Sequence, residues 1–185
     1  LPISLEFETL TLLGSCCAIN NWEDVADLDR LCDELGLDTI ETGAAIAVYM
    51  DSEGMSYGDA EGAKKLLRDD IANGSELGHL IGNGAVSIGT HRKHKRIPVA
   101  KGQSLPAWDP RPLKVAGVTY CTSAMGADHT AGIKIDPDIS GEDAVYASQQ
   151  AQIANAACDG SGFCQFLSPS LEEMSGCYAL FYGEE

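Results

Sequence analysis

The sequence predicts a mainly α, multihelical protein, and three observations support that fold class. Apolar residues recur at spacings of three and four along several segments, which is the spacing of one helix face. These segments begin at residues that cap helices and end at glycines. With 185 residues, 44% of them hydrophobic, the chain is long enough to bury a core as one domain or two small ones.

The first helix is predicted between Asn21 and Leu35. Asn21 is a capping residue, and Glu23 and Asp24 follow in the first turn, where negative charge is favourable. The apolar residues of this segment have helical spacing: Val25, Leu28, Leu31, Cys32 and Leu35. Gly36 is expected to end the helix by adopting a positive φ angle.

Two further helices are predicted in the next part of the chain. Asp38 is an N-cap with Glu41 three residues later, and the alanine-rich segment behind it runs to about Met50. The segment 59–73 is predicted to be helical, with Gly74 as its stop. Its apolar residues gather on one side: Ala63, Leu66, Leu67, Ile71 and Ala72.

The rest of the chain is less regular. Residues 75–89 are interrupted by glycines, and we expect them to be weakly helical. Residues 115–123 are either a short strand or a buried helix, because periodicity does not distinguish the two in so short an apolar run. Residues 141–158, rich in alanine and glutamine, predict a helix that stops at Gly160 or Gly162.

A proline-rich stretch predicts the boundary between two parts of the chain. The sequence LPAWDPRP at residues 105–112 is typical of an ordered connection rich in turns. We place the boundary near Pro98. The parts 1–97 and 98–185 are therefore expected to be two helical subdomains that pack around a cofactor cleft.

The composition argues against nucleic-acid and membrane partners. The chain has 28 acidic and 12 basic side chains, a net charge of −16, and such a surface repels phosphate backbones and anionic lipid. No apolar run approaches the ~20 residues that cross a bilayer. We interpret the one basic run, HRKHKR at residues 91–96, as a solvated loop.

The cysteines predict a reducing environment. Seven is an odd number, and no charged and then apolar signal segment precedes them, so a secreted disulfide framework is not expected. We therefore predict reduced thiols and a cytoplasmic location.

One internal repeat is the most informative feature of the sequence. Residues 32–38 read CDELGLD and residues 158–164 read CDGSGFC, each at the carboxyl end of a predicted helix. A helix that ends in a glycine turn holds the preceding aspartate, Asp33 or Asp159, rigidly beside that turn. Such a carboxylate can accept two parallel hydrogen bonds from a flat pair of N–H donors, as on the amino-pyrimidinone edge of a pterin. The alternative is that both copies are ordinary helix ends with an exposed aspartate.

With these motifs, the chain resembles the tungsten-dependent aldehyde ferredoxin oxidoreductases and their molybdenum or tungsten relatives. That family binds a bis-pterin cofactor through two DxxGL(C/D) motifs. Residues 6–8 and 13–15 are similar to its EYE and LG(A/S)N segments, residues 105–111 to LPAYDPRG, and residues 126–129 to GADH. The resemblance extends from about Leu5 to Phe166 and implies a fragment of the C-terminal helical domains.

The resemblance implies a set of cofactor-binding residues. Asp33 and Asp159 would hydrogen-bond the two pterins of a tungsten or molybdenum centre. The remaining residues of the two cradles would be Gly36, Leu37 and Asp38 in the first, and Gly162 and Phe163 in the second. Cys164, a thiol at the last motif position, would be the fourth ligand of a [4Fe–4S] cluster.

The resemblance also implies the chemistry. Glu8 and His129 match the two protonatable residues that the family places near the metal, where they would serve proton transfer and positioning. The reaction would convert an aldehyde and water to a carboxylic acid and pass two electrons to ferredoxin. Glu6 competes with Glu8 for the first role, and His129 could instead be a structural histidine.

Several family features lie outside this sequence. They are the CxxCxxxC run with the other three cluster cysteines, the large N-terminal β domain that carries the pterins, and most of the last helical domain. The family's ExxH interface-iron motif reads DLDR at residues 27–30, so we predict no such iron. An isolated chain is therefore expected to be apo and inactive. Two alternatives remain open: a stand-alone pterin-binding module, and a structural subunit without its own catalysis.

Overall fold

The chain folds into two helical units, each described here by itself. A computed structural model describes residues 5–132 and 134–183. The units are Leu1–Ala107 and Trp108–Glu185, and their division lies inside the proline-rich stretch, beyond Pro98. The mainly α, multihelical prediction is confirmed, since β1 (Val99–Ala100) and β2 (Gln103–Ser104) form the one small antiparallel sheet of the described residues. Which family domain each unit represents stays a prediction.

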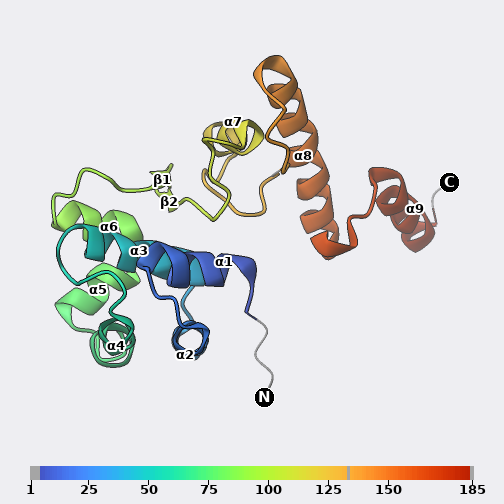
Figure 1. Cartoon of the computed structure of the whole chain (residues 1–185). Helices are drawn as coiled ribbons and strands as arrows, with labels where there is room; N and C mark the ends of the chain where they lie inside the picture. Colours follow the sequence, from blue (N-terminus) through green and yellow to red (C-terminus); the bar gives the residue numbers. More distant parts are fainter. Residues whose placement is uncertain (1–4, 133, 184–185) are drawn as a thin grey trace. The chain divides into compact units, whose positions relative to one another are not determined.

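The first unit is a group of helices around α3 (Figure 1). A continuous helical run opens it, comprising α1 (Phe7–Thr9), a π-helical turn (Leu10–Gly14) and a 3-10 turn (Ser15–Cys17). The following elements are α2 (Trp22–Leu35), α3 (Thr39–Asp51), α4 (Ala60–Lys65), a second π-helical turn (Leu66–Ile71), α5 (Glu76–Gly82) and α6 (Gly84–His91). The largest fully buried apolar side chains of this core are Leu13, Leu28, Ile46, Leu67, Ile81 and Ile88.

The predicted capping residues are confirmed. Asn21 Oδ1 accepts a hydrogen bond from the backbone N–H of Glu23 at 3.0 Å, and Asp38 Oδ2 accepts one from Glu41 at 2.7 Å. Asp59 caps α4 in the same way, through the N–H of Gly62 at 2.8 Å. These bonds satisfy N–H groups that have no partner inside the helix, which explains why local sequence was enough to place the helix starts.

Residues 75–89, expected to be interrupted by glycines and weakly helical, form two short helices, α5 and α6, with the break at Gly84. Glu41 of α3 caps the start of α6, where the local sequence provides no side-chain cap. Its Oε1 accepts from the N–H of Ala85 at 2.9 Å, and its two oxygens accept from the backbone and hydroxyl of Ser104. Gly84 has φ +87°, and a Cβ there would lie 2.3 Å from Glu41 Oε1, so only glycine allows this approach.

The basic run is exposed except at His94, as the solvated-loop interpretation expects, and three of its side chains also bind the carboxyl end of α3. His94 Nε2 lies 2.7 Å from Asp51 Oδ2, and Arg96 Nη2 donates to Asp51 Oδ1 at 2.8 Å. Arg92 Nη2 donates to the backbone carbonyl of Ser52, the residue after α3, at 2.6 Å. Burial of Asp51 opposes its ionisation, but the His94 hydrogen bond and the Arg96 charge outweigh burial and lower the pKa of Asp51.

A buried lysine joins α2 to α4. Lys64 is only 5% exposed, and its Nζ lies 2.6 Å from Asp24 Oδ1, 3.3 Å from Asp27 Oδ2 and 3.0 Å from Glu61 Oε1. These carboxylates raise the pKa of Lys64, and the hydrogen bond to Asp24 makes the largest contribution. The lysine therefore stays charged and offsets part of the negative charge of three neighbouring carboxylates.

Replacing Lys64 by methionine should lower the free energy of unfolding by about 2 kcal/mol, because three partly exposed carboxylates lose their shared cation. Urea unfolding followed by circular dichroism measures this change. Lys65→Met is the matched control: Lys65 is exposed, and its replacement should change stability by less than about 0.5 kcal/mol. Equal stability of both variants would contradict the structural role of Lys64.

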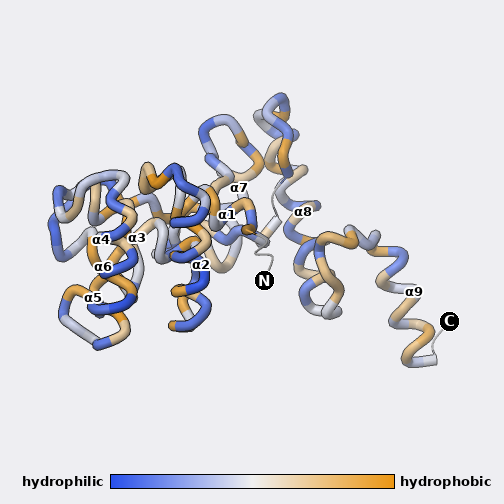
Figure 2. The backbone as a smooth tube through the Cα atoms, turned by 60° about the horizontal axis from the view of Figure 1, so that its bottom comes forward, coloured by the Kyte–Doolittle hydropathy of each residue, from blue (hydrophilic) through white to orange (hydrophobic). Residues whose placement is uncertain are grey.

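The second unit contains α7 (Lys114–Thr122), α8 (Gly141–Ser161), a 3-10 turn (Gln165–Leu167) and α9 (Leu171–Tyr182). The ambiguous run 115–123 is thus helical, and the predicted helix at 141–158 is confirmed. α7 packs against α8, where Thr119 Oγ1 lies 2.7 Å from Ser148 Oγ. Figure 2 shows hydrophobic residues along much of α9. Within the described residues, no helix combines the length and the apolar character needed to cross a membrane.

Candidate functional site

The first copy of the repeated motif ends α2 in a Schellman turn. The N–H of Leu37 donates to the carbonyl of Cys32 at 2.8 Å, and the N–H of Gly36 donates to the carbonyl of Asp33 at 3.2 Å. Gly36 has φ 68° and ψ 38°, the left-handed conformation that such a turn requires. Cys32 is buried and Asp33 is exposed, so the turn presents the carboxylate at the surface.

The second copy ends α8 with the same two hydrogen bonds. The N–H of Phe163 donates to the carbonyl of Cys158 at 3.2 Å, and the N–H of Gly162 donates to the carbonyl of Asp159 at 3.2 Å. Gly162 has φ 75° and ψ 11°. Cys158 is buried and Asp159 is exposed. The sequence repeat is therefore also a repeat of local structure, with an equivalent carboxylate in each copy.

The two copies share their backbone path up to the last motif position. Asp38 has φ −70° and ψ 130°, and Cys164 has φ −72° and ψ 127°. Each residue directly precedes the next helical element, α3 in one case and the 3-10 turn in the other. The copies therefore differ in chemistry at this position: Asp38 carries a carboxylate that caps α3, whereas Cys164 carries an exposed thiol.

Glu8 lies in α1 as a buried carboxylate, 4% exposed. Its Oε2 accepts a hydrogen bond from the backbone N–H of Ala107 at 2.7 Å, which ties it to the LPAWDPR segment. Glu8 also contributes, after burial, to the raised pKa of Cys16. Glu6 is exposed. Burial and a fixed hydrogen bond favour Glu8 over Glu6 as the functional glutamate.

The arginine of the LPAWDPR segment pairs with a carboxylate of the same segment. Arg111 donates from its backbone N–H to Asp109 Oδ1 at 2.8 Å, and its guanidinium binds both carboxylate oxygens. This pair lowers the pKa of Asp109. Asp109 and Arg111 therefore form a rigid turn in the part of the segment that follows Ala107.

His129 is half-buried in the loop between α7 and α8. Asp128 Oδ1 accepts from the N–H of Thr130 at 3.0 Å, which closes a turn around the histidine. Asn155 of α8 donates from Nδ2 to the Thr130 carbonyl at 2.7 Å. The histidine-bearing loop is thus attached to α8, the helix that ends in the second motif turn.

Each unit contains one half of the predicted site residues. The first unit contains Glu8, Asp33, Gly36, Leu37 and Asp38, and the second contains His129, Asp159, Gly162, Phe163 and Cys164. Across the residues that the structure describes, no group of three or more histidine, cysteine, aspartate or glutamate side chains could hold a metal ion.

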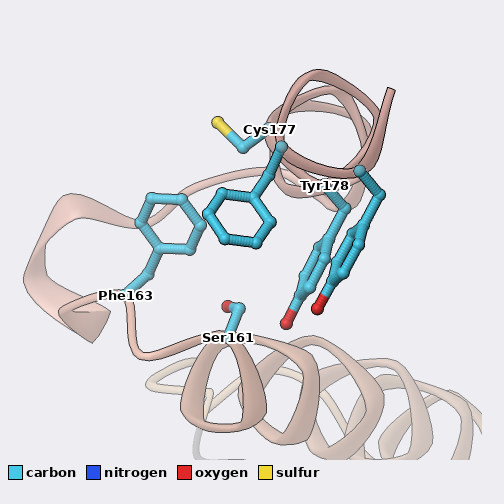
Figure 3. Close-up of a pocket in the computed structure, with 6 residues that line it drawn as sticks. Ser161, Phe163, Cys177 and Tyr178 are labelled. Atoms are coloured by element: carbon cyan, nitrogen blue, oxygen red, sulfur yellow. The ribbon is translucent and has the colours of Figure 1, made fainter. Parts of the chain in front are cut away.

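A shallow pocket of about 290 Å³ lies between the second turn, at Ser161 and Phe163, and α9 (Figure 3). Its lining residues are Ser161, Phe163, Cys177, Tyr178, Phe181 and Tyr182. Tyr178 and Tyr182 stack with ring centroids 6.1 Å apart. Four of these six residues are aromatic, and the pocket joins the end of α8 to α9.

Sequence reasoning missed several polar residues around the two turns. They are Thr9, Asp29, Thr39, Asn155 and Gln165, which bond one another or the motif residues. A signal was present in the sequence, since Asp29 and Asn155 each stand four residues before the motif aspartate.

Comparison with known proteins gives the family context of these turns. The family described as "Aldehyde ferredoxin oxidoreductase, domains 2 & 3" matches residues 3–185. The tungsten-containing aldehyde ferredoxin oxidoreductases of Pyrococcus furiosus and Thermococcus kodakarensis are each 28% identical to the chain. The one of Pyrococcus abyssi is 24% identical. Each alignment covers 87% of this chain and 31% of the relative, so the chain spans about a third of the length of these proteins.

Proposed function

Because the chain belongs to the aldehyde ferredoxin oxidoreductase family, we propose that it is part of an enzyme that oxidises aldehydes to carboxylic acids with ferredoxin as electron acceptor. The repeated turn carries this proposal: two helices end in the same hydrogen-bonded geometry, and each presents an exposed aspartate. Two equivalent carboxylates suit a prosthetic group with two equivalent heads.

The two turns fit a bis-pterin cofactor of tungsten or molybdenum. Asp33 and Asp159 would each accept paired N–H bonds from one pterin, since a carboxylate matches such a flat donor pair. The backbone at Gly36–Leu37 and Gly162–Phe163 would form the rest of each cradle.

Cys164 fits the role of one ligand of a [4Fe–4S] cluster. Its thiol is exposed and directly follows the second cradle. Such clusters take about four thiolates, so the remaining ligands would come from an N-terminal β domain of the longer protein. Cys164 would hold one corner of the cluster, and the cluster would supply electron transfer towards ferredoxin when bound.

Glu8 and His129 would move protons as an aldehyde and water become a carboxylic acid, two protons and two electrons. The Ala107 N–H fixes Glu8 Oε2, and burial excludes bulk water, so the carboxylate has one defined orientation in which to hold a proton. The His129 imidazole would be the second group that donates or accepts a proton in this step. When bound, the metal and its pterins supply the two-electron acceptor that these side chains lack.

Metal analysis of the longer protein that contains this chain tests the proposal. The purified protein should contain tungsten or molybdenum together with iron, and should reduce ferredoxin when an aldehyde is added. Absence of all three metals would contradict the enzyme and favour a module without catalysis.

In that protein, Cys164→Ser should lower iron content and visible absorption and abolish ferredoxin reduction, because the cluster loses a thiolate. Cys177→Ser is the matched control, since Cys177 is also an exposed free cysteine of the second unit and should be replaceable without loss of iron. Unchanged iron in the Cys164 variant would refute its role as a ligand.

A further inference from the structure

In the first unit, Thr9 links the segment that carries Glu8 to α2 and α3. Thr9 is buried, with 3% of its surface exposed. Its Oγ1 lies 3.1 Å from Thr39 Oγ1 and, at the long limit of a hydrogen bond, 3.5 Å from Asp29 Oδ1. Asp29 lies on α2, one turn before Asp33. The two carboxylates lie four residues apart on one helix face, and burial and then the charge of Asp33 raise the pKa of Asp29.

In the second unit, Asn155 links the segment that carries His129 to the second turn. Its Nδ2 donates to the Thr130 carbonyl at 2.7 Å and to Gln165 Oε1 at 3.0 Å. Gln165 Nε2 in turn donates to Asp159 Oδ1 at 2.7 Å. A continuous chain of hydrogen bonds therefore joins the residue after His129 to the motif aspartate.

The two networks correspond in position. Asp29 and Asn155 each stand four residues before the motif aspartate, so each lies on the same helix face as that aspartate. The residues that they reach, Thr9 and Thr130, each directly follow the proposed proton-transfer residue. A third polar side chain in each network directly follows the last motif position: Thr39 and Gln165. The repeat thus extends from the backbone turns to the side chains around them.

We propose that these two networks position the proton-transfer residues. In the first unit the network holds the segment carrying Glu8 at a fixed place relative to the turn carrying Asp33. In the second unit it holds the segment carrying His129 relative to the turn carrying Asp159. The inference rests on the proposed function, because it concerns the same site. Neither segment is a long regular helix: α1 has three residues before a π-helical turn, and His129 lies in a loop. Side-chain bonds therefore have to fix groups whose misplacement by about 1 Å costs about 100-fold in rate.

Two isosteric variants of the cofactor-loaded protein test this inference. Thr9→Val removes the hydroxyl and keeps the shape, and Asn155→Leu removes the amide at similar size. Each should lower kcat about tenfold, with KM and metal content unchanged within about twofold, because each variant loses the side-chain hydrogen bonds that align its segment. Thr9→Ser keeps the hydroxyl and should restore kcat to within about twofold of the wild type.

Hydrogen exchange gives a readout that is independent of activity. Asn155→Leu should speed amide exchange in residues 126–131 without affecting α8. Thr9→Val should speed amide exchange in residues 7–10. Unchanged kcat and exchange in both variants would overturn the inference, as would a Thr9→Ser variant as impaired as Thr9→Val. If the wild type neither binds metal nor oxidises aldehydes, the proposed function fails, and the exchange data alone decide whether the networks fix the two segments.

Discussion

Replacing Glu8 by glutamine should lower kcat for aldehyde oxidation by about 10²–10⁴-fold, the range expected when a proton-transfer group is removed. The amide oxygen of glutamine can still accept the Ala107 hydrogen bond, so the side chain should keep its place. It cannot take up or release a proton near neutral pH. Steady-state kinetics with a saturating aldehyde measure the effect, and tungsten and iron content should be unchanged.

Glu6→Gln is the matched control for Glu8→Gln. Glu6 lies two residues earlier and is exposed, so its replacement should leave kcat within about twofold. Equal losses in the two variants would show that a general change in local charge was measured. A fully active Glu8 variant would remove Glu8 from the mechanism.

Replacing Asp33 or Asp159 by alanine should strongly reduce the amount of bound cofactor. Each carboxylate is proposed to accept two hydrogen bonds, and bonds to charged groups contribute about 1.5–3 kcal/mol each. Loss of both should therefore weaken cofactor binding at that turn by about 100-fold or more. The measurement is metal and pterin per protein after purification.

Glu34→Ala provides the control for the aspartate variants. Glu34 is the exposed neighbour of Asp33 in the same last turn of α2, but it is not the repeated position. Its replacement should leave cofactor content unchanged. Full metal content in both aspartate variants would instead indicate that the two turns are only helix ends.

The sequence predicted those parts of the fold that depend on neighbouring residues. Asn21 and Asp38 bind N–H groups two and three residues away, and Gly36 takes the positive φ angle expected of a helix stop. The repeated motif was likewise predictable, because its hydrogen bonds close within a few residues. Local patterns therefore located the two turns of the candidate site.

The features that sequence reasoning missed depend on distant partners. The cap of α6 comes from Glu41, which lies 44 positions before Ala85, and the basic run binds Asp51 of α3. The positioning networks connect residues 20 and 25 positions apart. Nothing in the local sequence encodes such pairs, although the matching spacing of Asp29 and Asn155 becomes a signal once the structure reveals their contacts.

An experimental structure of the cofactor-loaded protein would measure the distance from the Asp33 and Asp159 carboxylates to the prosthetic group. We expect both carboxylates to lie about 3 Å from N–H donors of one shared bis-pterin group, the length of a hydrogen bond. Two carboxylates that face different sides of the protein, with no common group between them, would contradict the proposal that the repeated turns form a single site.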